Sequence, residues 1–348
     1  MINIANYKIG QDAPPFIIAE MSGNHNQSLE RAMRIVDAAV DAGAHAIKLQ
    51  TASADGLTLD VDSPDFNIHD KSSLWYGKNL YQLYKEAVTP WEWHAPIFEH
   101  CRQRGIIAFS SPFELKAVDF LESLNVPCYK IASFELIDTQ LVRRVAQTGK
   151  PMIMSTGMAT LSEIETAVRI ARAEGNEKII LLKCTSTYPA CPTNTNVRTL
   201  THLREAFGTQ VGLSDHTMGV GVSCAAVAMG ATVIEKHFTL ARADGGVDAA
   251  FSLEPHELKL LVEETQRAWQ SIGVIRYGGS EDEQASLKYR RSIYISQDIK
   301  SGDLLTTENI RVVRPGFGLP PKHYDLLLGR RANRDLAKGT AMSWEYIG

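Results

Sequence analysis

The segment GLSDHTMGVGVSCAAVAMGATVIEKHF, residues 212–238, decides the fold of this chain. Its ends carry two short β-type runs, VGLSDH and TVIEKH, and the small apolar residues of Val220–Met229 between them have a helical composition. A strand, a helix and a strand in this order predict a βαβ unit with two parallel strands. His216 and His237 then lie together at the carboxyl ends of these strands, where open α/β sheets and barrels bind their ligands.

Two neutral imidazoles at one strand edge indicate a site for a divalent metal. The alternative is that each histidine caps the end of its own strand independently. The metal interpretation is favoured by the polar residues crowded at the same two strand ends, which need a ligand or one another as partners. These residues are Ser214, Asp215, Glu235 and Lys236.

The same alternation of strand and helix continues along most of the chain. Strand-like runs begin at eight positions: Pro15, Ala46, Ile106, Tyr129, Pro151, Ile179, Val211 and Thr232. Helical patterns fill the gaps at Leu29–Ala42, Trp93–Gln103, Leu115–Leu124, Gln140–Gln147, Ser162–Ala173, Leu200–Phe207, Val220–Met229 and His256–Ile272. Apolar strands alternating with helices eight times predict a closed (β/α)8 TIM barrel. A doubly wound open sheet is the alternative, but no GxGxxG motif follows the first strand to support it.

Nearly every predicted strand ends in polar side chains that can bind or react. They are Glu20, Lys48 with Gln50, Ser110 with Ser111, Lys130 with Ser133, Ser155 with Thr156, Lys183 with Thr185, Ser214 to His216, and Glu235 to His237. Solvent exposure explains one such strand end, but it is a poor explanation for so many on one face of a barrel. Lysines and hydroxyls gathered there suit a small, multiply anionic substrate, because ammonium groups neutralise phosphate or carboxylate and hydroxyls orient it.

Two regions depart from this repeat. Residues 52–93 form a long insertion rich in aromatic residues, among them Trp75 and Tyr76, and we expect it to cover the substrate. A purely structural lid is the alternative. After a linker at 278–291, the tail from residue 292 to 348 carries short β signals, SIYI, NIRVV and LPPKHY. The sequence therefore predicts a barrel domain at 1–277 and a small β-rich domain at 292–348.

Composition excludes several classes of function. The chain has 348 residues, 44% hydrophobic and 22% charged, and its net charge of −4 gives no basic footprint for nucleic acid or an anionic membrane. The start MINIANYKIGQD lacks the pattern of a signal peptide, and the longest nearly apolar run, Gly219–Ile234, is too short to span a membrane. Five cysteines without CxxC spacing predict reduced thiols in a cytoplasmic protein.

Several ordered motifs together resemble the sialic acid synthase family over essentially the whole chain. They are AEMSGNHN from Ala19, IKLQT from Ile47, YKIAS from Tyr129, MSTGM from Met154, GLSDHT from Gly212 and EKHF from Glu235, with SGDLL and RPGFG in the tail. The resemblance implies that phosphoenolpyruvate condenses with an open-chain N-acetylated aldose, releasing phosphate and giving a nine-carbon nonulosonic acid. It also implies that the tail is an antifreeze-like (SAF) domain, which caps the barrel of the partner subunit in a domain-swapped homodimer.

Roles for individual residues come from the same resemblance. His216 and His237 match the metal ligands, for Mn²⁺ or Mg²⁺, and Glu20 matches an acidic residue near the attacking water. A buried ion pair with a neighbouring lysine is the alternative for Glu20. Arg314 matches a tail arginine that reaches the N-acyl group of the sugar, with a solvated surface arginine as its alternative. The remaining matches are Lys48, Ser111, Lys130, Ser133, Ser155 and Ser214 for phosphoenolpyruvate, and Glu135, Tyr188, Glu235 and Asp248 for the metal or the sugar.

The choice of sugar rests on three further segments, DGGVDAAFSLEP, LWYGK and YKEAVTPWEWH, which are most like the pseudaminic acid branch of the family. Ala249, Ala250 and Phe251, with Trp75 and Tyr76, offer apolar surface for a methyl and an extra acetamido group. The expected partner of phosphoenolpyruvate is therefore 2,4-diacetamido-2,4,6-trideoxy-L-altrose. The alternative branch forms N-acetylneuraminate or legionaminate from an N-acetylmannosamine-type sugar.

Two other classes of function stay open. One is an aldolase, or another metal-dependent barrel lyase, that acts on a free keto acid. The other is a sugar-binding or ice-binding protein that uses the tail alone, although the full set of polar strand ends argues against it.

Overall fold

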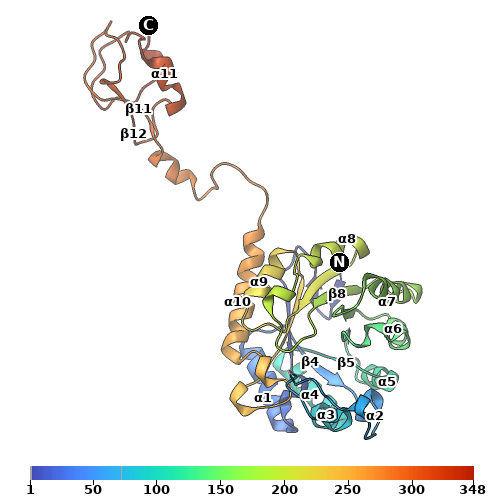
Figure 1. Ribbon diagram of the computed structural model, residues 1–348. Coiled ribbons are helices and arrows are strands. Elements are labelled where there is room, and N and C mark those ends of the chain that lie inside the picture. The colour runs from blue at the N-terminus through green and yellow to red at the C-terminus, as the bar shows by residue number, and fades with distance from the viewer. Residues whose placement is uncertain (1, 72) are drawn as a thin grey trace. The chain divides into compact units, whose positions relative to one another are not determined.

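The computed structural model describes residues 2–71 and 73–348, which form two compact units. The first unit ends at Gly273 and the second spans Val274–Gly348. Figure 1 shows the first as a ring of strands surrounded by helices and the second as a small unit with few regular elements. None of the helices in these described ranges combines the length and the apolar character needed to cross a membrane.

Within the described residues, eight strands of the first unit pair in parallel and close into a barrel in the order β10-β3-β4-β5-β6-β7-β8-β9. The strands are β3 (Phe16–Glu20), β4 (Ala46–Thr51), β5 (Ile107–Pro112), β6 (Tyr129–Ile131), β7 (Met152–Ser155), β8 (Ile179–Cys184), β9 (Gln210–Ser214) and β10 (Val233–His237). Most of their residues are buried, as expected of parallel strands that are covered on both faces. The predicted barrel is confirmed, strand for strand.

Each strand is followed by a helix that covers the outside of the barrel (Figure 1). These helices are α1 (Leu29–Asp41), α4 (Trp91–Arg104), α5 (Leu115–Ser123), α6 (Thr139–Ala146), α7 (Leu161–Ala173), α8 (Thr199–Phe207), α9 (Gly221–Ala228) and α10 (Pro255–Ile272). Local sequence sets their starts, because Ser28 caps α1 and a capping box of Thr160 and Glu163 begins α7. All of the predicted helices are present, each ending within two residues of its expected bounds.

An N-terminal hairpin, β1 (Ile2–Ile4) and β2 (Tyr7–Ile9), was not expected from the sequence. The ring of Tyr7 lies 4.9 Å from that of Phe16, the first residue of β3, and 4.6 Å from that of His45, just before β4. The hairpin therefore covers the amino-terminal end of the barrel. The opposite end of the barrel, where the strands have their carboxyl ends, is therefore the end at which we expect a ligand-binding site.

The insertion after β4 contains α2 (Ala54–Leu57), η2 (Pro64–Phe66) and α3 (Leu80–Ala87). The other short 3-10 helices of the first unit follow strands or helices at its rim. They are η1 (Ser22–His25), η3 (Glu135–Ile137), η4 (Pro192–Asn194), η5 (Arg242–Asp244) and η6 (Ala249–Phe251).

The second unit holds an antiparallel pair, β11 (Ser292–Ile295) and β12 (Ile310–Val313), over its own apolar core. The remaining elements are η7 (Gln284–Tyr289), η8 (Pro321–His323), α11 (Tyr324–Leu327) and η9 (Trp344–Tyr346). The β signal expected at LPPKHY was wrong, because this segment forms η8 and the start of α11. Proline suits the first turn of a helix, where its missing N–H has no helical partner to lose.

Candidate active site

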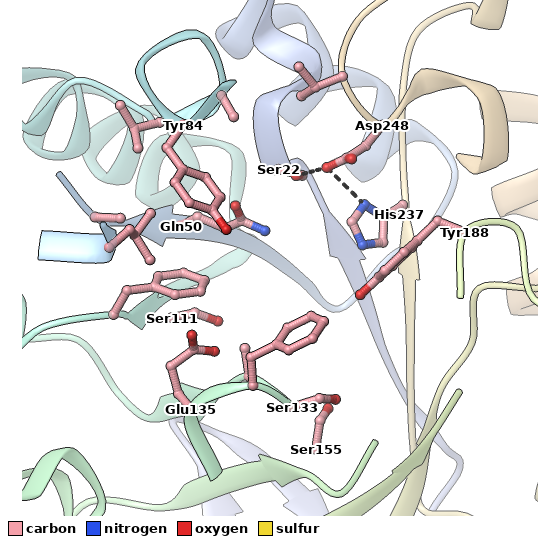
Figure 2. Close-up of a pocket in the computed structure, with 18 of the residues that line it drawn as sticks. Ser22, Gln50, Tyr84, Ser111, Ser133, Glu135, Ser155, Tyr188, His237 and Asp248 are labelled. Atoms are coloured by element: carbon pink, nitrogen blue, oxygen red, sulfur yellow. Dashed lines mark hydrogen bonds and ion pairs between the residues drawn. The ribbon is translucent and has the colours of Figure 1, made fainter. Parts of the chain in front are cut away.

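A cavity of about 400 Å³ opens at the carboxyl-terminal end of the barrel. Its floor, as we call it, consists of side chains at or just after the strand ends. These are Lys48, Ser111, Lys130, Ser133, Ser155, Cys184, Ser214, His216, Glu235 and His237. Its roof comes from the insertion and consists of Leu57, Ile68, Ser73, Trp75, Leu80, Leu83, Tyr84, Ala87 and Val88. Figure 2 shows Gln50, Glu135, Tyr188 and Asp248 pointing into the space between them.

His216 and His237 lie side by side in the floor, because β9 and β10 pair in parallel. Their ring centroids are 5.3 Å apart. His216 Nδ1 lies 2.9 Å from the carbonyl oxygen of Thr185, which can only accept, so the lone pair of the ring is on Nε2. Burial, together with the nearby His216 and lysines, holds the pKa of His237 well below its usual value, so this ring is neutral.

The donors around the two histidines fit a divalent cation. The described residues offer no hydrogen-bond partner to His237 Nδ1 or to Glu235 Oε2, although both atoms are buried. Asp248 accepts from the Ser22 hydroxyl and holds one oxygen 3.7 Å from His237 Nδ1, as Figure 2 shows. Imidazole nitrogens beside an unpartnered carboxylate oxygen suit a first-row divalent cation such as Mn²⁺, and the carboxylate oxygen is also a ligand for Mg²⁺.

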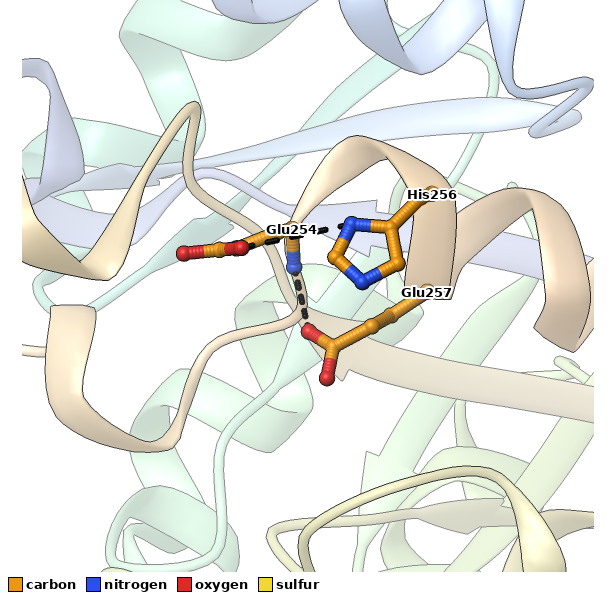
Figure 3. Close-up of side chains that lie close together, drawn as sticks. All are labelled: Glu254, His256 and Glu257. Carbon is orange, nitrogen blue, oxygen red and sulfur yellow. Dashed lines mark hydrogen bonds and ion pairs between the residues drawn. The ribbon is translucent and has the colours of Figure 1, made fainter.

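A second group of acidic and histidine side chains, Glu254, His256 and Glu257, lies at the start of α10 (Figure 3). The contacts of these side chains stabilise the start of the helix and the loop before it. Glu254 and Glu257 form the capping box of α10, and Glu257 also pairs with Arg242. His256 is exposed and Glu254 accepts from the backbone N–H of Arg242 at 2.8 Å, so this group holds the preceding loop in place.

Two buried lysines and the carboxylate of Glu235 form the charged part of the floor, and a second buried carboxyl group, that of Glu20, lies beneath it. Lys48 pairs with Glu20, and Glu235 Oε1 lies 3.5 Å from both Lys48 Nζ and Lys130 Nζ. Burial alone would lower the pKa of Lys48, but the two carboxylates raise it above its usual value. For Lys130 burial outweighs Glu235, and its pKa is lowered. Lys48 Nζ also donates to the Ser111 hydroxyl at 3.1 Å.

The serine hydroxyls complete the floor. Ser155 Oγ is buried and has no hydrogen-bond partner in the part of the chain that the structure describes, so it is free to bind a ligand. Ser133 lies against Gly157, where an added Cβ would approach within 2.5 Å of the serine Cβ. Gly157 also has a φ of +40°, which side chains other than glycine rarely adopt. The MSTGM turn therefore brings these two serines close together because it contains glycine.

Asp215 and Lys236 point to the opposite side of their strands from the histidines that follow them. They form a buried ion pair, with Lys236 Nζ 3.0 Å from Asp215 Oδ2. Asp215 also accepts from Thr217 N at 2.9 Å and from the Ser223 hydroxyl at 2.7 Å. The pair ties the end of β9, the end of β10 and the start of α9 together. The polar residues crowded at these strand ends thus partner one another on one side and leave the histidines for a ligand on the other.

The sides and roof of the cavity hold the expected sugar-binding residues. Burial raises the pKa of Glu135 to about 7, and its Oε2 has no hydrogen-bond partner among the described residues. Tyr188 packs between Trp75, at 5.9 Å, and His216, at 4.6 Å between ring centroids. Trp75 Nε1 donates to Val247 O at 3.0 Å, which ties the insertion to the loop after β10.

The apolar surface does not come from all of the expected residues. Among the described residues that line the cavity, Trp75 is present but Tyr76, Ala249, Ala250 and Phe251 are not. Phe251 is buried and packs 4.9 Å from the His237 ring, so it supports the floor from behind. Tyr76 is 52% exposed. The roof helix α3 supplies the apolar surface in their place.

Most of the site residues expected from the sequence meet in this cavity, but two do not. Glu20 is fully buried beneath Lys48 and pairs with it, which matches the alternative interpretation of Glu20 as half of a buried ion pair. Its Oε1 also accepts from Ser22 N at 2.7 Å. Arg314 is exposed in the second unit. At β8 the sequence singled out Lys183 and Thr185, yet Cys184 lines the cavity, while Lys183 Nζ donates to the carbonyl of Cys184.

Cys184 and Tyr84 are cavity residues that the sequence analysis missed. Burial would raise the pKa of Cys184, but the contact of its Sγ with His216, at 3.9 Å, outweighs burial and lowers the pKa to about 6. No clear signal for Cys184 was present in the sequence, because β8 is apolar almost to its end. The signal for Tyr84 was the apolar spacing of α3, from Leu80 to Ala87.

Comparisons with known proteins agree with this architecture. The chain matches a model of the NeuB family over residues 35–277 and a model of the SAF domain over residues 290–347. A pseudaminic acid synthase from Campylobacter jejuni is 44% identical over 331 residues, 95% of this chain and 96% of the relative. Another from Helicobacter pylori is 40% identical and covers 96% and 98%.

Structural similarity leads to the same family. The crystal structure of an N-acetylneuraminic acid synthetase from Leptospira borgpetersenii, in complex with citrate, superposes with a TM-score of 0.73 and is 33% identical. The match covers 82% of this chain and 94% of that one. From the barrel, the SAF domain and these similarities, the chain belongs to the NeuB family.

Proposed function

We propose that the chain is a pseudaminic acid synthase, a transferase that joins phosphoenolpyruvate, 2,4-diacetamido-2,4,6-trideoxy-L-altrose and water into pseudaminic acid and phosphate. The observation that carries this proposal is the floor of the cavity, where buried lysines, serine hydroxyls and two imidazoles converge. The relatives from Campylobacter jejuni and Helicobacter pylori, at 44% and 40% identity, support the choice of sugar. The alternative product is N-acetylneuraminate or legionaminate.

Phosphoenolpyruvate occupies the charged part of the floor. Lys48 and Lys130 neutralise its phosphate and carboxylate, because both ammonium groups are buried and line the cavity. The hydroxyls of Ser111, Ser133, Ser155 and Ser214 orient it from the neighbouring strand ends. Binding in a buried site also excludes bulk water from the enol carbon.

The sugar aldehyde lies over His216 and His237. These residues would hold a divalent metal, Mn²⁺ or Mg²⁺, which supplies Lewis-acid polarisation of the aldehyde oxygen. Asp248, whose carboxylate oxygen lies 3.7 Å from His237 Nδ1, and Glu235, which has an unpartnered carboxylate oxygen, would add oxygen ligands beside the imidazoles.

The bond-forming step joins the enol carbon of phosphoenolpyruvate to the aldehyde carbon. Positive charge then develops at the carbon that carries the phosphate, and the former aldehyde oxygen takes up a proton to become a hydroxyl. Water adds at the positive carbon and loses a proton, and the bond between that carbon and the phosphate oxygen breaks as the ketone forms and phosphate leaves. Glu235 lines this end of the cavity beside Lys48, where its carboxylate stabilises positive charge and helps to accept the proton of the water. Glu20, paired with Lys48 beneath the cavity, acts on the same charge through that lysine. Glu135 and Tyr188 contact the sugar.

We also propose a role for the tail in the active site of a dimer. The barrel domain at 1–277, the linker at 278–291 and the SAF domain at 292–348 form a cytoplasmic, domain-swapped homodimer in which Arg314 binds the N-acyl group of the sugar in the partner's barrel. Mixing Arg314→Ala subunits with His216→Ala subunits then recovers part of the activity once the subunits exchange. Mixtures that stay inactive despite demonstrated exchange place the arginine in cis or away from the site.

The decisive experiment is a phosphate-release assay with phosphoenolpyruvate and a panel of acylamino sugars. We expect the specificity constant for 2,4-diacetamido-2,4,6-trideoxy-L-altrose to exceed that for N-acetylmannosamine by about 10- to 200-fold for each apolar group that differs. A preference for N-acetylmannosamine contradicts the proposal. Trapping of a Schiff base by borohydride would instead identify a lysine aldolase.

A further inference from the structure

Helix α3 presents one face to the cavity. Leu80, Leu83, Tyr84 and Ala87 follow the spacing i, i+3, i+4, i+7, which places them on one stripe of a helix, and all four line the cavity. The other face, with Gln82, Lys85 and Glu86, is exposed. An apolar stripe on a short helix normally packs on a protein core. Here it covers the space above the floor, so its partner is whatever fills the cavity.

The position of α3 is fixed by contacts that do not involve the cavity. Asn79 caps the helix by accepting from Tyr81 N at 2.9 Å. At the other end, the Gln27 side-chain amide donates to the carbonyl oxygens of Glu86 and Val88, at 2.9 and 3.0 Å. The stripe is therefore preformed, and a preformed wall discriminates between ligands by shape and polarity.

Two polar groups interrupt this apolar surface. The Tyr84 hydroxyl comes from α3, and Glu135 comes from η3 on another side of the cavity, as Figure 2 shows. Glu135 is near enough to raise the pKa of Tyr84, after burial, and Glu135 Oε2 has no hydrogen-bond partner among the residues that the structure describes. The stripe of α3 and Glu135 thus provide one hydroxyl donor, one carboxylate acceptor and an apolar surface.

An acetamido group has the complementary set of features. Its carbonyl accepts one hydrogen bond, its N–H donates one, and its methyl is apolar. The reacting end of the sugar lies at the histidines of the floor, so the substituents farther along the sugar chain reach the roof. We infer that the Leu80–Leu83–Tyr84 stripe of α3, with Glu135, is the subsite that selects the acetamido group at carbon 4 of the sugar. This inference rests on the proposed function and names the part of the site that sets its sugar specificity.

The test uses two sugars that differ only at carbon 4, the 2,4-diacetamido sugar and its 4-amino analogue without the second acetyl group. The variants are Tyr84→Phe, which removes one hydrogen bond, and Leu80→Asn, which makes the stripe polar. Gln82→Ala on the exposed face of the same helix is the matched control. The readouts are the ratio of kcat/KM for the two sugars, the KM for phosphoenolpyruvate, and the melting temperature.

We expect Tyr84→Phe to reduce the preference for the diacetamido sugar by about threefold to tenfold, the value of one hydrogen bond. Leu80→Asn should reduce it by about tenfold or more. The KM for phosphoenolpyruvate stays at its wild-type value in both, and Gln82→Ala changes neither quantity. A ratio within twofold of wild type in both variants overturns the subsite while the proposed function stands. Absence of phosphate release with either sugar in the wild type overturns the proposed function, and the subsite with it.

Discussion

The floor and the roof of the cavity are built from different kinds of backbone. Floor side chains project from strands that are hydrogen-bonded into a closed barrel, and their register fixes which residues meet. The roof is carried by an insertion of short helices, which Gln27 and Trp75 tie to the rest of the unit. Charge is concentrated in the floor and apolar surface in the roof. Under the proposed function, this division assigns the reaction to the barrel and the choice of sugar to the insertion.

The largest effect is expected from removing the imidazoles of the floor. His237→Ala and His216→Ala should each lower kcat/KM by about a thousandfold, about 4 kcal/mol, because each variant lacks one ligand of the proposed metal, which would polarise the aldehyde. Chelator should abolish phosphate release, and Mn²⁺ should restore it. The melting temperature of the variants serves as the control for folding. Full activity in chelator after dialysis contradicts the assignment.

A smaller effect is expected from the buried pair behind the histidines. Asp215→Asn leaves Lys236 without its charge partner, so the ends of β9 and β10 lose the contact that sets the spacing of His216 and His237. Mn²⁺ affinity, measured by titration calorimetry, should fall by about 10- to 100-fold, the range for residues that orient metal ligands.

The matched control for Asp215→Asn is Asp119→Asn. Asp119 is 65% exposed and pairs with Arg144 at 2.7 Å on the surface of the barrel. Such a pair contributes about 0–1 kcal/mol and lies away from the histidines, so Mn²⁺ affinity should not change. Equal affinity in wild type and in Asp215→Asn would show that the barrel positions the histidines without this ion pair.

The two regions should also differ in how they tolerate a methyl group. A Cβ at Gly212, in β9, would lie 2.2 Å from the carbonyl oxygen of Val233, so Gly212→Ala forces the barrel apart. At Gly77, in the insertion, the described residues place nothing within 4 Å, and only its φ of +81° disfavours alanine. We expect losses of about 1–3 kcal/mol for Gly212→Ala and about 1 kcal/mol for Gly77→Ala, measured by urea unfolding. Equal losses at the two positions contradict the distinction between a rigid floor and a tolerant insertion.

The barrel could be predicted because its strands are continuous apolar runs and its helices have clear starts. The floor followed from the polar side chains at nearly every strand end, since a parallel barrel gathers the ends of its strands on one face. At β8, Lys183 and Thr185 were chosen only because they are the polar residues at the strand end. The sequence of this strand, IILLKC, is apolar almost to its end. It therefore shows no alternation of polar and apolar residues that would tell which side chains face the cavity, and Lys183 was chosen although Cys184 faces it.

The roof could not be predicted in the same way. Ala249 and Phe251 have the apolar character that a sugar pocket needs, but long-range packing buries them behind the floor. The stripe of α3 has helical spacing, and sequence alone cannot distinguish a stripe that meets a core from one that meets a cavity. The N-terminal hairpin was missed because its strands have only three residues each.

The smallest expected effect concerns the pH dependence of Glu135, which faces the roof. Burial raises its pKa from 4.5 to about 7, with Lys130 and Lys48 opposing the shift and Asp138 adding to it. Because the folded-state pKa lies above the unfolded value, ionisation costs the native state stability. This cost is absent below pH 4.5, grows up to about pH 7, and is fully present above it. Glu135→Gln should therefore melt higher than wild type at pH 8 and equally at pH 4.

The wild-type KM for the sugar should fall by about threefold between pH 6 and pH 8, as the ionised carboxylate becomes a better acceptor for the amide N–H. In Glu135→Gln the KM for the sugar should be independent of pH. If the KM of this variant instead depends on pH as it does in wild type, the titrating group lies in the floor.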